Sequence, residues 1–252
     1  MGAWTWAAAS CRGTSHAKSG EKRQDAFVCS TAGARSPLIA VLCDGAGSAR
    51  MGGQGAALIA RAVDTKARER CRATLGAIPD DVVWSWVTEA RDRVAKAAAK
   101  RDLTRRDFAA TMICVISDGS ETLVAHIGDG AVVVRDRADQ LWHVLSWPSH
   151  GEYASTTFFV TDEPAPKLVL QRRASPISAL VAFTDGLERL ALDFAAGRAH
   201  APFFQGILGP VAASEAVGRD QSLCAALARY LDSDAVNART DDDKTLLVAA
   251  HR

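Results

Sequence analysis

The chain has 252 residues and the composition of an ordinary soluble protein, with 48% hydrophobic and 23% charged residues. Its length allows one large domain or two small ones, and either could bury a substantial core. Thirty basic residues against twenty-nine acidic ones leave a formal net charge of +1, so no overall field favours nucleic acid or a membrane surface.

The six cysteines are scattered, with no Cys-x-x-Cys pair, and most of them fall within apolar runs. This pattern argues for a reducing compartment and against both a disulfide framework and a zinc site. The first residues lack the basic and long apolar regions of a secretion signal, and no run reaches the length of a membrane span. We therefore expect a cytoplasmic enzyme or binding module.

Strand and helix signals alternate along the first half of the chain. Aromatic, branched or continuously apolar stretches predict three strands, at residues 4–10, 25–31 and 37–44. Apolar residues at helical spacing, with charges between them, predict two helices, at residues 53–71 and 79–102.

The second half opens with a block of short strands separated by tight turns, at residues 108–117, 121–128, 130–136 and 139–146. Such neighbours indicate an antiparallel meander rather than crossover units. A less regular stretch then leads to a strand at 178–184, further helices and a last strand at 245–250. We predict one α+β domain over residues 1–252, with helices grouped around antiparallel sheets.

Acidic residues recur where apolar strands begin or end. Asp44 and Asp185 each end a strand and precede a glycine, in VLCDGAGSARMGG and VAFTDG. The other acids of this kind are Asp25 before AFVCS, Asp129 between two glycines, and the run Asp241, Asp242 and Asp243 before the last strand.

Carboxylates at strand ends project together at one edge of a sheet, and a divalent cation relieves their repulsion. Hard cations such as Mg²⁺ and Mn²⁺ prefer oxygen ligands of this type. Each acid also has a plainer interpretation, because Asp-Gly is foremost a turn signal and an acidic run is commonly a solvated loop. Gly128-Asp129-Gly130 alone would be a hairpin turn. From the residues alone, a metal site and a set of turns are about equally supported.

The order and spacing of these motifs resemble the metal-dependent type 2C (PPM) protein phosphatases, especially their compact bacterial subgroup. The resemblance extends from GTSHAKSGEKRQDAF through VLCDGAGSARMGGQGA, FAAT, HIGDGAVVVRD and VAFTDGLERL to the closing DDDKT. It implies a four-layer α-β-β-α sandwich of two stacked antiparallel sheets flanked by helices. It also implies hydrolysis of phosphoserine and phosphothreonine in proteins by a metal-activated water, without a phosphoenzyme.

The resemblance assigns roles to the acids. Asp44 matches the residue that bridges two Mn²⁺ or Mg²⁺ ions, with the Gly45 carbonyl as a further ligand. Asp185 and Asp242 match metal ligands, Asp25 matches the carboxylate that holds metal-bound water, and Asp129 matches a ligand of a weaker third ion. The implied partners are phosphorylated substrates of a bacterial Ser/Thr kinase, or the kinase itself, and we expect a monomer.

Two departures from the family pattern leave roles open. Ala46 stands where many relatives have a histidine that can protonate the leaving group, so that proton would come from His16, His150 or metal-bound water. A structural role is the commoner one for a histidine placed like His16. The phosphate-gripping arginine is also missing, and Lys18, Lys22 and Arg23 are substitutes that equally suit a plain surface.

The segment SHGEYASTTFF stands where the family has a variable flap beside the active site. His150, Glu152 and Tyr153 are candidates for substrate contact there, although a loop packed on its own aromatic residues is equally expected. Two other functions stay open: a catalytically idle relative that binds a phosphoprotein, and a phosphatase of small phosphate esters.

Overall fold

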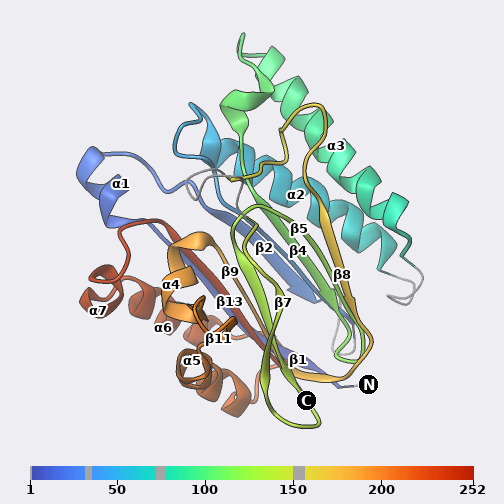
Figure 1. Ribbon diagram of the computed structural model, residues 1–252, viewed down its shortest axis with the longest axis vertical. Coiled ribbons are helices and arrows are strands. Elements are labelled where there is room, and N and C mark those ends of the chain that lie inside the picture. Colours follow the sequence, from blue (N-terminus) through green and yellow to red (C-terminus); the bar gives the residue numbers. More distant parts are fainter. Residues whose placement is uncertain (1, 32–35, 72–77, 150–156) are drawn as a thin grey trace.

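The computed structural model describes residues 2–31, 36–71, 78–149 and 157–252. Two β-sheets lie face to face at its centre, and helices cover the outer face of each (Figure 1). The layers therefore follow the order α-β-β-α, and the predicted fold class is confirmed. In the described part of the chain, no helix is both long and apolar enough to cross a membrane.

The first sheet has five antiparallel strands in the order β2-β3-β4-β5-β8. They are β2 (Ala26–Thr31), β3 (Leu38–Cys43), β4 (Met112–Ser117), β5 (Thr122–Ile127) and β8 (Val169–Arg173). Helix α2 (Gly52–Arg70) packs on β2, β3 and β4, and α3 (Asp80–Ala99) packs on α2. A short 3-10 turn, η2 (Arg105–Phe108), joins α3 to β4.

The second sheet has six strands in the order β12-β1-β13-β9-β6-β7. They are β1 (Trp4–Cys11), β6 (Ala131–Asp136), β7 (Trp142–Ser146), β9 (Ile177–Phe183), β12 (Gly218–Arg219) and β13 (Lys244–His251). All pairs are antiparallel except the two-residue pairing of β12 with β1.

Helices and short elements complete the outer layer of the second sheet. Helix α5 (Ala201–Ala213) packs on β13, and α6 (Gln221–Leu231) packs on β1. The remaining elements are α1 (Thr14–Ser19), η3 (Asp185–Leu187), α4 (Glu188–Ala191), β10 (Leu192–Asp193), β11 (Arg198–Ala199) and α7 (Asp234–Asn237).

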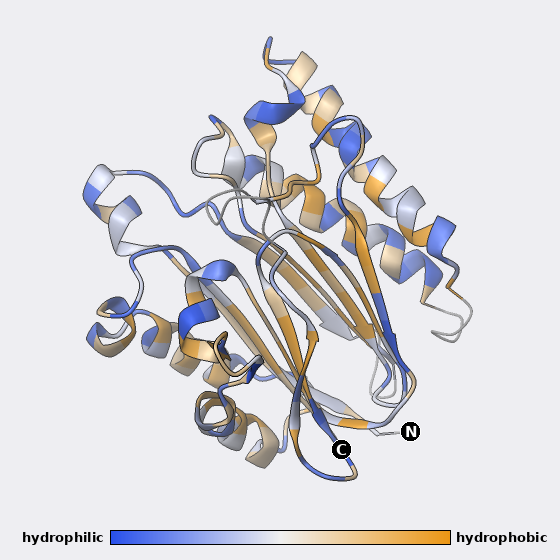
Figure 2. Ribbon diagram, viewed as in Figure 1, coloured by the Kyte–Doolittle hydropathy of each residue, from blue (hydrophilic) through white to orange (hydrophobic). Residues whose placement is uncertain are grey.

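The central strands are apolar on both faces because both faces are covered. On β13, Leu246 and Val248 face the helices, while Leu247 and Ala249 face the other sheet. This burial explains why such strands read as continuous apolar runs rather than as alternating ones. Figure 2 shows the same contrast, with largely hydrophobic strands inside and mixed helices outside.

The predicted meander of four strands is wrong in one respect. Strands β4 and β5 form a hairpin in the first sheet, whereas β6 and β7 form a hairpin in the second. Gly128-Asp129-Gly130 is therefore no hairpin turn, because it carries the chain from one sheet to the other. Gly128 has φ +115°, a conformation that favours glycine. Helix α1 and strand β8 were not predicted, since both are short and have weak periodicity.

Candidate active site

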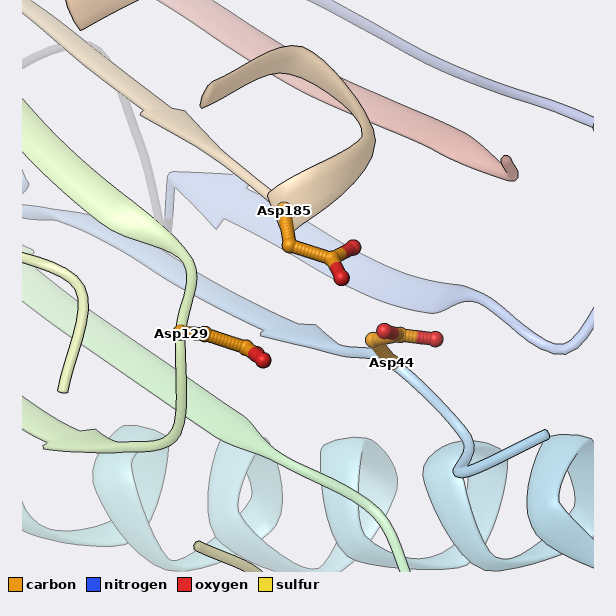
Figure 3. A group of neighbouring side chains, drawn as sticks. All are labelled: Asp44, Asp129 and Asp185. Atoms are coloured by element: carbon orange, nitrogen blue, oxygen red, sulfur yellow. The ribbon is translucent and has the colours of Figure 1, made fainter. Parts of the chain in front are cut away.

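Three carboxylates meet at one end of the stacked sheets. Asp44 follows β3, Asp129 lies in the crossover between β5 and β6, and Asp185 begins η3 directly after β9. One oxygen from each lies within 4.8 Å of the others. Figure 3 shows the three side chains pointing toward one another from separate segments of the chain. Both sheets thus supply acids to one cluster.

The segment after β3 is clamped by the FAAT stretch that precedes β4. The Asp44 backbone N–H donates to Thr111 Oγ1 at 3.0 Å, and the Thr111 N–H donates to the Asp44 carbonyl at 2.8 Å. Gly45 leaves no room for a side chain, since a Cβ there would lie 2.3 Å from the carbonyl carbon of Gly52. This close approach to the start of α2 fixes the direction in which Asp44 points.

A similar close approach brings the acidic run at 241–243 to Asp185. A Cβ on Gly186 would lie 2.0 Å from the Asp243 carbonyl oxygen, so glycine is required where η3 meets the segment before β13. Asp242 consequently lines the same cavity as Asp44, Asp129 and Asp185. The Asp-Gly motifs at Asp44 and Asp185 and the acidic run at 241–243 thus meet in one site.

Asp25 lies behind this cluster and is only 3% exposed. Its Oδ2 accepts hydrogen bonds from Thr184 Oγ1 at 2.8 Å and Thr245 Oγ1 at 2.6 Å. No N–H or O–H donor from the described residues reaches its Oδ1. The Asp44 carboxyl group lies within hydrogen-bonding range of Asp25, so one acid here faces another.

Burial and mutual repulsion raise the pKa values of these acids. Burial raises the pKa of Asp25 to about 6, against the hydrogen bonds from its threonine partners. Burial, and then the charges of neighbouring carboxylates, raise the pKa values of Asp44 and Asp185 well above their usual range. The pKa of Asp242 is also raised, chiefly by burial. Four ionised carboxylates are therefore unfavourable here without a compensating cation.

The residues fit a divalent cation. The buried Asp25 Oδ1 without a donor, the converging carboxylates and the raised pKa values all indicate a missing positive charge. The available donor atoms are oxygens, which suits Mg²⁺ or Mn²⁺ rather than a soft metal.

His16 reaches the same cavity from α1. Its Nδ1 lies 3.0 Å from Asp243 Oδ1, and its Nε2 lies 3.5 Å from the Glu21 carboxylate. Burial alone would lower the pKa of His16, but its contact with Asp243 and the charges of Asp242 and Glu21 raise it on balance. The structure thus places a protonatable imidazole beside the acid cluster.

Asp243 is a residue whose role the sequence did not reveal. It is 1% exposed and accepts backbone hydrogen bonds from Gly13 at 2.6 Å and Gln24 at 2.5 Å, besides contacting His16. The Gln24 side-chain amide, oriented to donate, reaches the Gly45 carbonyl at 2.8 Å. Asp243 therefore ties α1 and the segment before β2 to the site.

Three of the predicted substrate-binding residues, Lys18, Lys22 and Arg23, do not line the cavity over the acids. Lys18 and Lys22 are exposed and are not among the described residues that line the cavity. The Arg23 guanidinium donates to the backbone carbonyls of Ser10 at 2.7 Å and Asp25 at 3.2 Å. Glu152, together with His150 and Tyr153, lies outside the described residues.

An open cavity of about 1000 Å³ lies over the acids. Besides Asp44, Asp129, Asp185 and Asp242, its lining includes His16 from α1 and residues of η2 and the 157–167 segment. The fold and site together define a class of protein: an α-β-β-α sandwich whose two sheets present a carboxylate cluster to an open cavity, as in metal-dependent phosphatases.

Comparisons with known proteins agree with this class. The family model described as protein phosphatase 2C matches residues 12–232. The chain is 37% identical over 253 residues to serine/threonine-protein phosphatase 3 of Escherichia coli (strain K12), with 98% of each chain covered. The chain therefore belongs to the protein phosphatase 2C family, and its enzymatic class is phosphoprotein phosphatase.

Solved structures show the same fold. PppA, described as a key regulatory component of T6SS in Pseudomonas aeruginosa, superposes with a TM-score of 0.69 at 16% identity, covering 99% of this chain and 98% of that one. The catalytic domain of the serine/threonine protein phosphatase PstP, in complex with two manganese ions, gives 0.63 at 18% identity, covering 100% and 99%.

Proposed function

We propose that this protein is a Mn²⁺- or Mg²⁺-dependent phosphatase that removes phosphate from phosphoserine and phosphothreonine residues of proteins. The observation that carries the proposal is the set of four acids on one cavity, with the buried Asp25 behind them. The E. coli relative, named a serine/threonine-protein phosphatase, and the two manganese ions in the PstP complex support it.

Asp44, Asp185, Asp242 and the Gly45 carbonyl are the residues that would hold two cations, with Asp25 behind them and Asp129 available to a weaker third. Bound there, the cations would lower the pKa of water and neutralise charge on the phosphoryl group. The chain's own residues set the geometry: Thr184 and Thr245 orient Asp25, and Gln24 holds the Gly45 carbonyl.

We assign the proton donor for the leaving oxygen to His16. A serine or threonine alkoxide is a poor leaving group, so a positioned acid at its oxygen accelerates departure. His16 lines the cavity, Asp243 Oδ1 lies 3.0 Å from its Nδ1, and Nε2, 3.5 Å from the Glu21 carboxylate, is the nitrogen left to donate the proton. Asp243 is then a positioning residue, because it acts through His16.

The substrates we propose are phosphoproteins of the cytoplasm, either substrates of a bacterial Ser/Thr kinase or the kinase itself. All six cysteines are free, which agrees with a reducing compartment. The E. coli relative matches this chain almost end to end, which supports one domain over residues 1–252.

The test is hydrolysis of p-nitrophenyl phosphate and of a phosphothreonine peptide with and without Mn²⁺, comparing wild type with Asp44→Ala and Asp185→Ala. We expect activity that needs metal and is lost in both variants. A wild type that is inactive, and that binds no Mn²⁺ by calorimetry, would instead favour a phosphoprotein-binding relative without catalysis. Activity on p-nitrophenyl phosphate but on no phosphopeptide would favour a small phosphate ester as substrate.

A further inference from the structure

The wall of the cavity next to α3 carries positively charged side chains that take no part in the acid cluster. This wall consists of η2 and the 157–167 segment, and among its described residues Arg106 and Lys167 line the cavity. Both side chains belong to exposed residues, and neither lies in the segments that supply the acids. They are therefore placed at the rim, where the part of a substrate beyond its phosphate would lie.

Neighbouring arginines of this wall have structural partners. The Arg91 guanidinium donates to the backbone carbonyls of Val160 and Asp162, both at 2.7 Å. The Arg105 guanidinium lies 2.6 Å from the Glu163 carboxylate, which Arg91 also approaches at 3.4 Å. These two arginines thus hold the 157–167 segment against α3 and η2.

Arg106 differs from both of them. No hydrogen bond or ion pair joins its guanidinium to another described residue, although its backbone sits in a turn closed by the Thr104–Asp107 capping box. The adjoining Asp107 N–H and carbonyl are fixed too, since the Met51 N–H donates to that carbonyl at 2.7 Å. Within the described ranges, the Arg106 guanidinium thus has no partner, while its backbone is anchored.

Lys167 is held at the same rim by an aromatic ring. Its Nζ lies 4.4 Å from the centre of the Phe158 ring, and Phe158 packs against the core beneath α2 and α3. A cation over a ring face keeps its remaining N–H donors available to an anion.

The acids of this wall are already engaged. Glu163 pairs with Arg91 and Arg105, Asp162 accepts the Phe159 N–H at 2.8 Å, and Asp107 accepts from Thr104. Among the residues of this wall that the structure describes, the unpaired charges are therefore positive, in contrast with the acidic floor of the cavity. An anionic group that the floor would repel is attracted here.

We propose that Arg106 and Lys167 form a specificity subsite that binds an acidic side chain, Asp or Glu, flanking the phosphorylated residue of the substrate. The carboxylate matches the planar fork of the Arg106 guanidinium, and Lys167 adds a second, less directional charge. The proposal rests on the proposed phosphatase function and deepens it, because it names the kind of phosphoprotein preferred.

The test uses two phosphothreonine peptides that differ only in having Asp and Glu, or Asn and Gln, around the phosphorylated residue. We expect wild type to prefer the acidic peptide in kcat/KM, mainly through KM, on the order of tenfold at low salt, and less as salt is added. The double variant Arg106→Gln/Lys167→Gln should lose this preference. Arg61→Gln, which removes an exposed arginine on α2 outside the cavity, should keep it.

Three results would overturn the inference: a wild type without the preference, a double variant that retains it, or an equal loss in Arg61→Gln. A further contradiction would be a double variant that raises KM for p-nitrophenyl phosphate as much as for the acidic peptide, since the cations would then act at the phosphoryl group itself. Arg106→Glu should reverse the preference toward a lysine-flanked peptide.

Failure of the phosphatase function itself is recognised separately. Binding of both fluorescent peptides to Asp185→Asn, followed by anisotropy, requires no turnover and should show the same charge preference. A wild type without Mn²⁺-dependent hydrolysis would contradict the proposed function. The binding preference would still test whether the subsite exists.

Discussion

His16 Nδ1 and Asp243 Oδ1 lie 3.0 Å apart, although 227 positions separate the two residues in the sequence. Asp243 is buried and also holds the backbone of Gly13 and Gln24, so the carboxylate that faces His16 is fixed. A buried carboxylate of this kind stabilises the protonated imidazole. His16 thereby gives the cavity a protonated group. Ala46, which follows Asp44 and Gly45, cannot provide one.

The first prediction concerns the dependence of His16→Gln on the leaving group. We expect kcat on a phosphothreonine peptide to fall by about 100-fold, because the departing alkoxide needs a proton. Hydrolysis of p-nitrophenyl phosphate should fall far less, since nitrophenolate leaves without one. Steady-state kinetics on both substrates measures the ratio. Equal losses on both would show that His16 is structural.

Replacing Asp243 by Asn should shift the pH profile of the activity that depends on protonated His16. His16 works in its protonated form, so activity declines as pH rises through its pKa. Contact with Asp243 raises that pKa, and loss of the charge lowers it, so the decline should begin at lower pH in Asp243→Asn. The profile of kcat for the phosphopeptide, at saturating Mn²⁺, tests this. An unshifted alkaline limb would separate Asp243 from the proton donor.

Metal-free protein should lose stability as pH rises through the pKa of Asp25. Burial raises that pKa from 3.8 to about 6, so the folded state retains a proton that the unfolded chain releases. Below pH 4 both states are protonated; above pH 6 the ionised carboxylate costs roughly 3 kcal/mol. Urea unfolding in EDTA at several pH values should show this contribution as the difference in slope between wild type and Asp25→Asn, since Asp44, Asp185 and Asp242 also have raised pKa values. Mn²⁺ should oppose the loss in wild type.

The pKa of His126 predicts a change in stability of the opposite sign, a loss as pH falls. It is buried on β5, its Nδ1 lies 2.8 Å from Ser146 Oγ on β7 of the other sheet, and burial lowers its pKa from 6.5 to about 4. The unfolded chain takes up a proton that the folded state refuses, so stability falls as pH drops from about 6.5 to 4, by roughly 3 kcal/mol. His126→Gln should remove this fall, whereas the exposed His143→Gln should not. Because the Asp25 effect has the opposite sign over the same pH range, the test is the difference between variants: equal pH slopes for wild type and His126→Gln would contradict this prediction.

Gly186→Ala should damage the site through packing alone. The new Cβ would lie 2.0 Å from the Asp243 carbonyl, so η3 and the segment before β13 must move apart. We expect a loss of about 1–3 kcal/mol in the free energy of unfolding, with weaker Mn²⁺ binding. Gly206→Ala on α5, where a Cβ meets nothing within 4 Å, should instead be neutral or stabilise by up to about 1 kcal/mol. Thermal melts and calorimetry compare them; similar effects of both changes would argue against the close approach.

The sequence predicted the central strands and singled out acids that the fold gathers on one cavity, because both are local signals. Apolar runs buried on two faces place β3, β9 and β13, and an acid with a glycine at a strand end is visible without the fold. The pairing of the strands was harder to predict from the sequence. Strands β5 and β6 follow each other closely, yet they belong to different sheets. A tight turn looks the same in sequence whether the chain reverses within a sheet or passes to another.

Side-chain direction was the part that only the tertiary structure decided. Arg23 stands beside Asp25 in sequence but donates to backbone carbonyls, whereas Arg106 and Lys167, far from every acidic motif, line the cavity. By itself, the sequence determined which acids are candidates for the chemistry, since residue type and strand periodicity are local properties. The folded chain decided which of them meet, because contacts such as that between Gly13 and Asp243 depend on the pairing of strands from opposite ends of the chain.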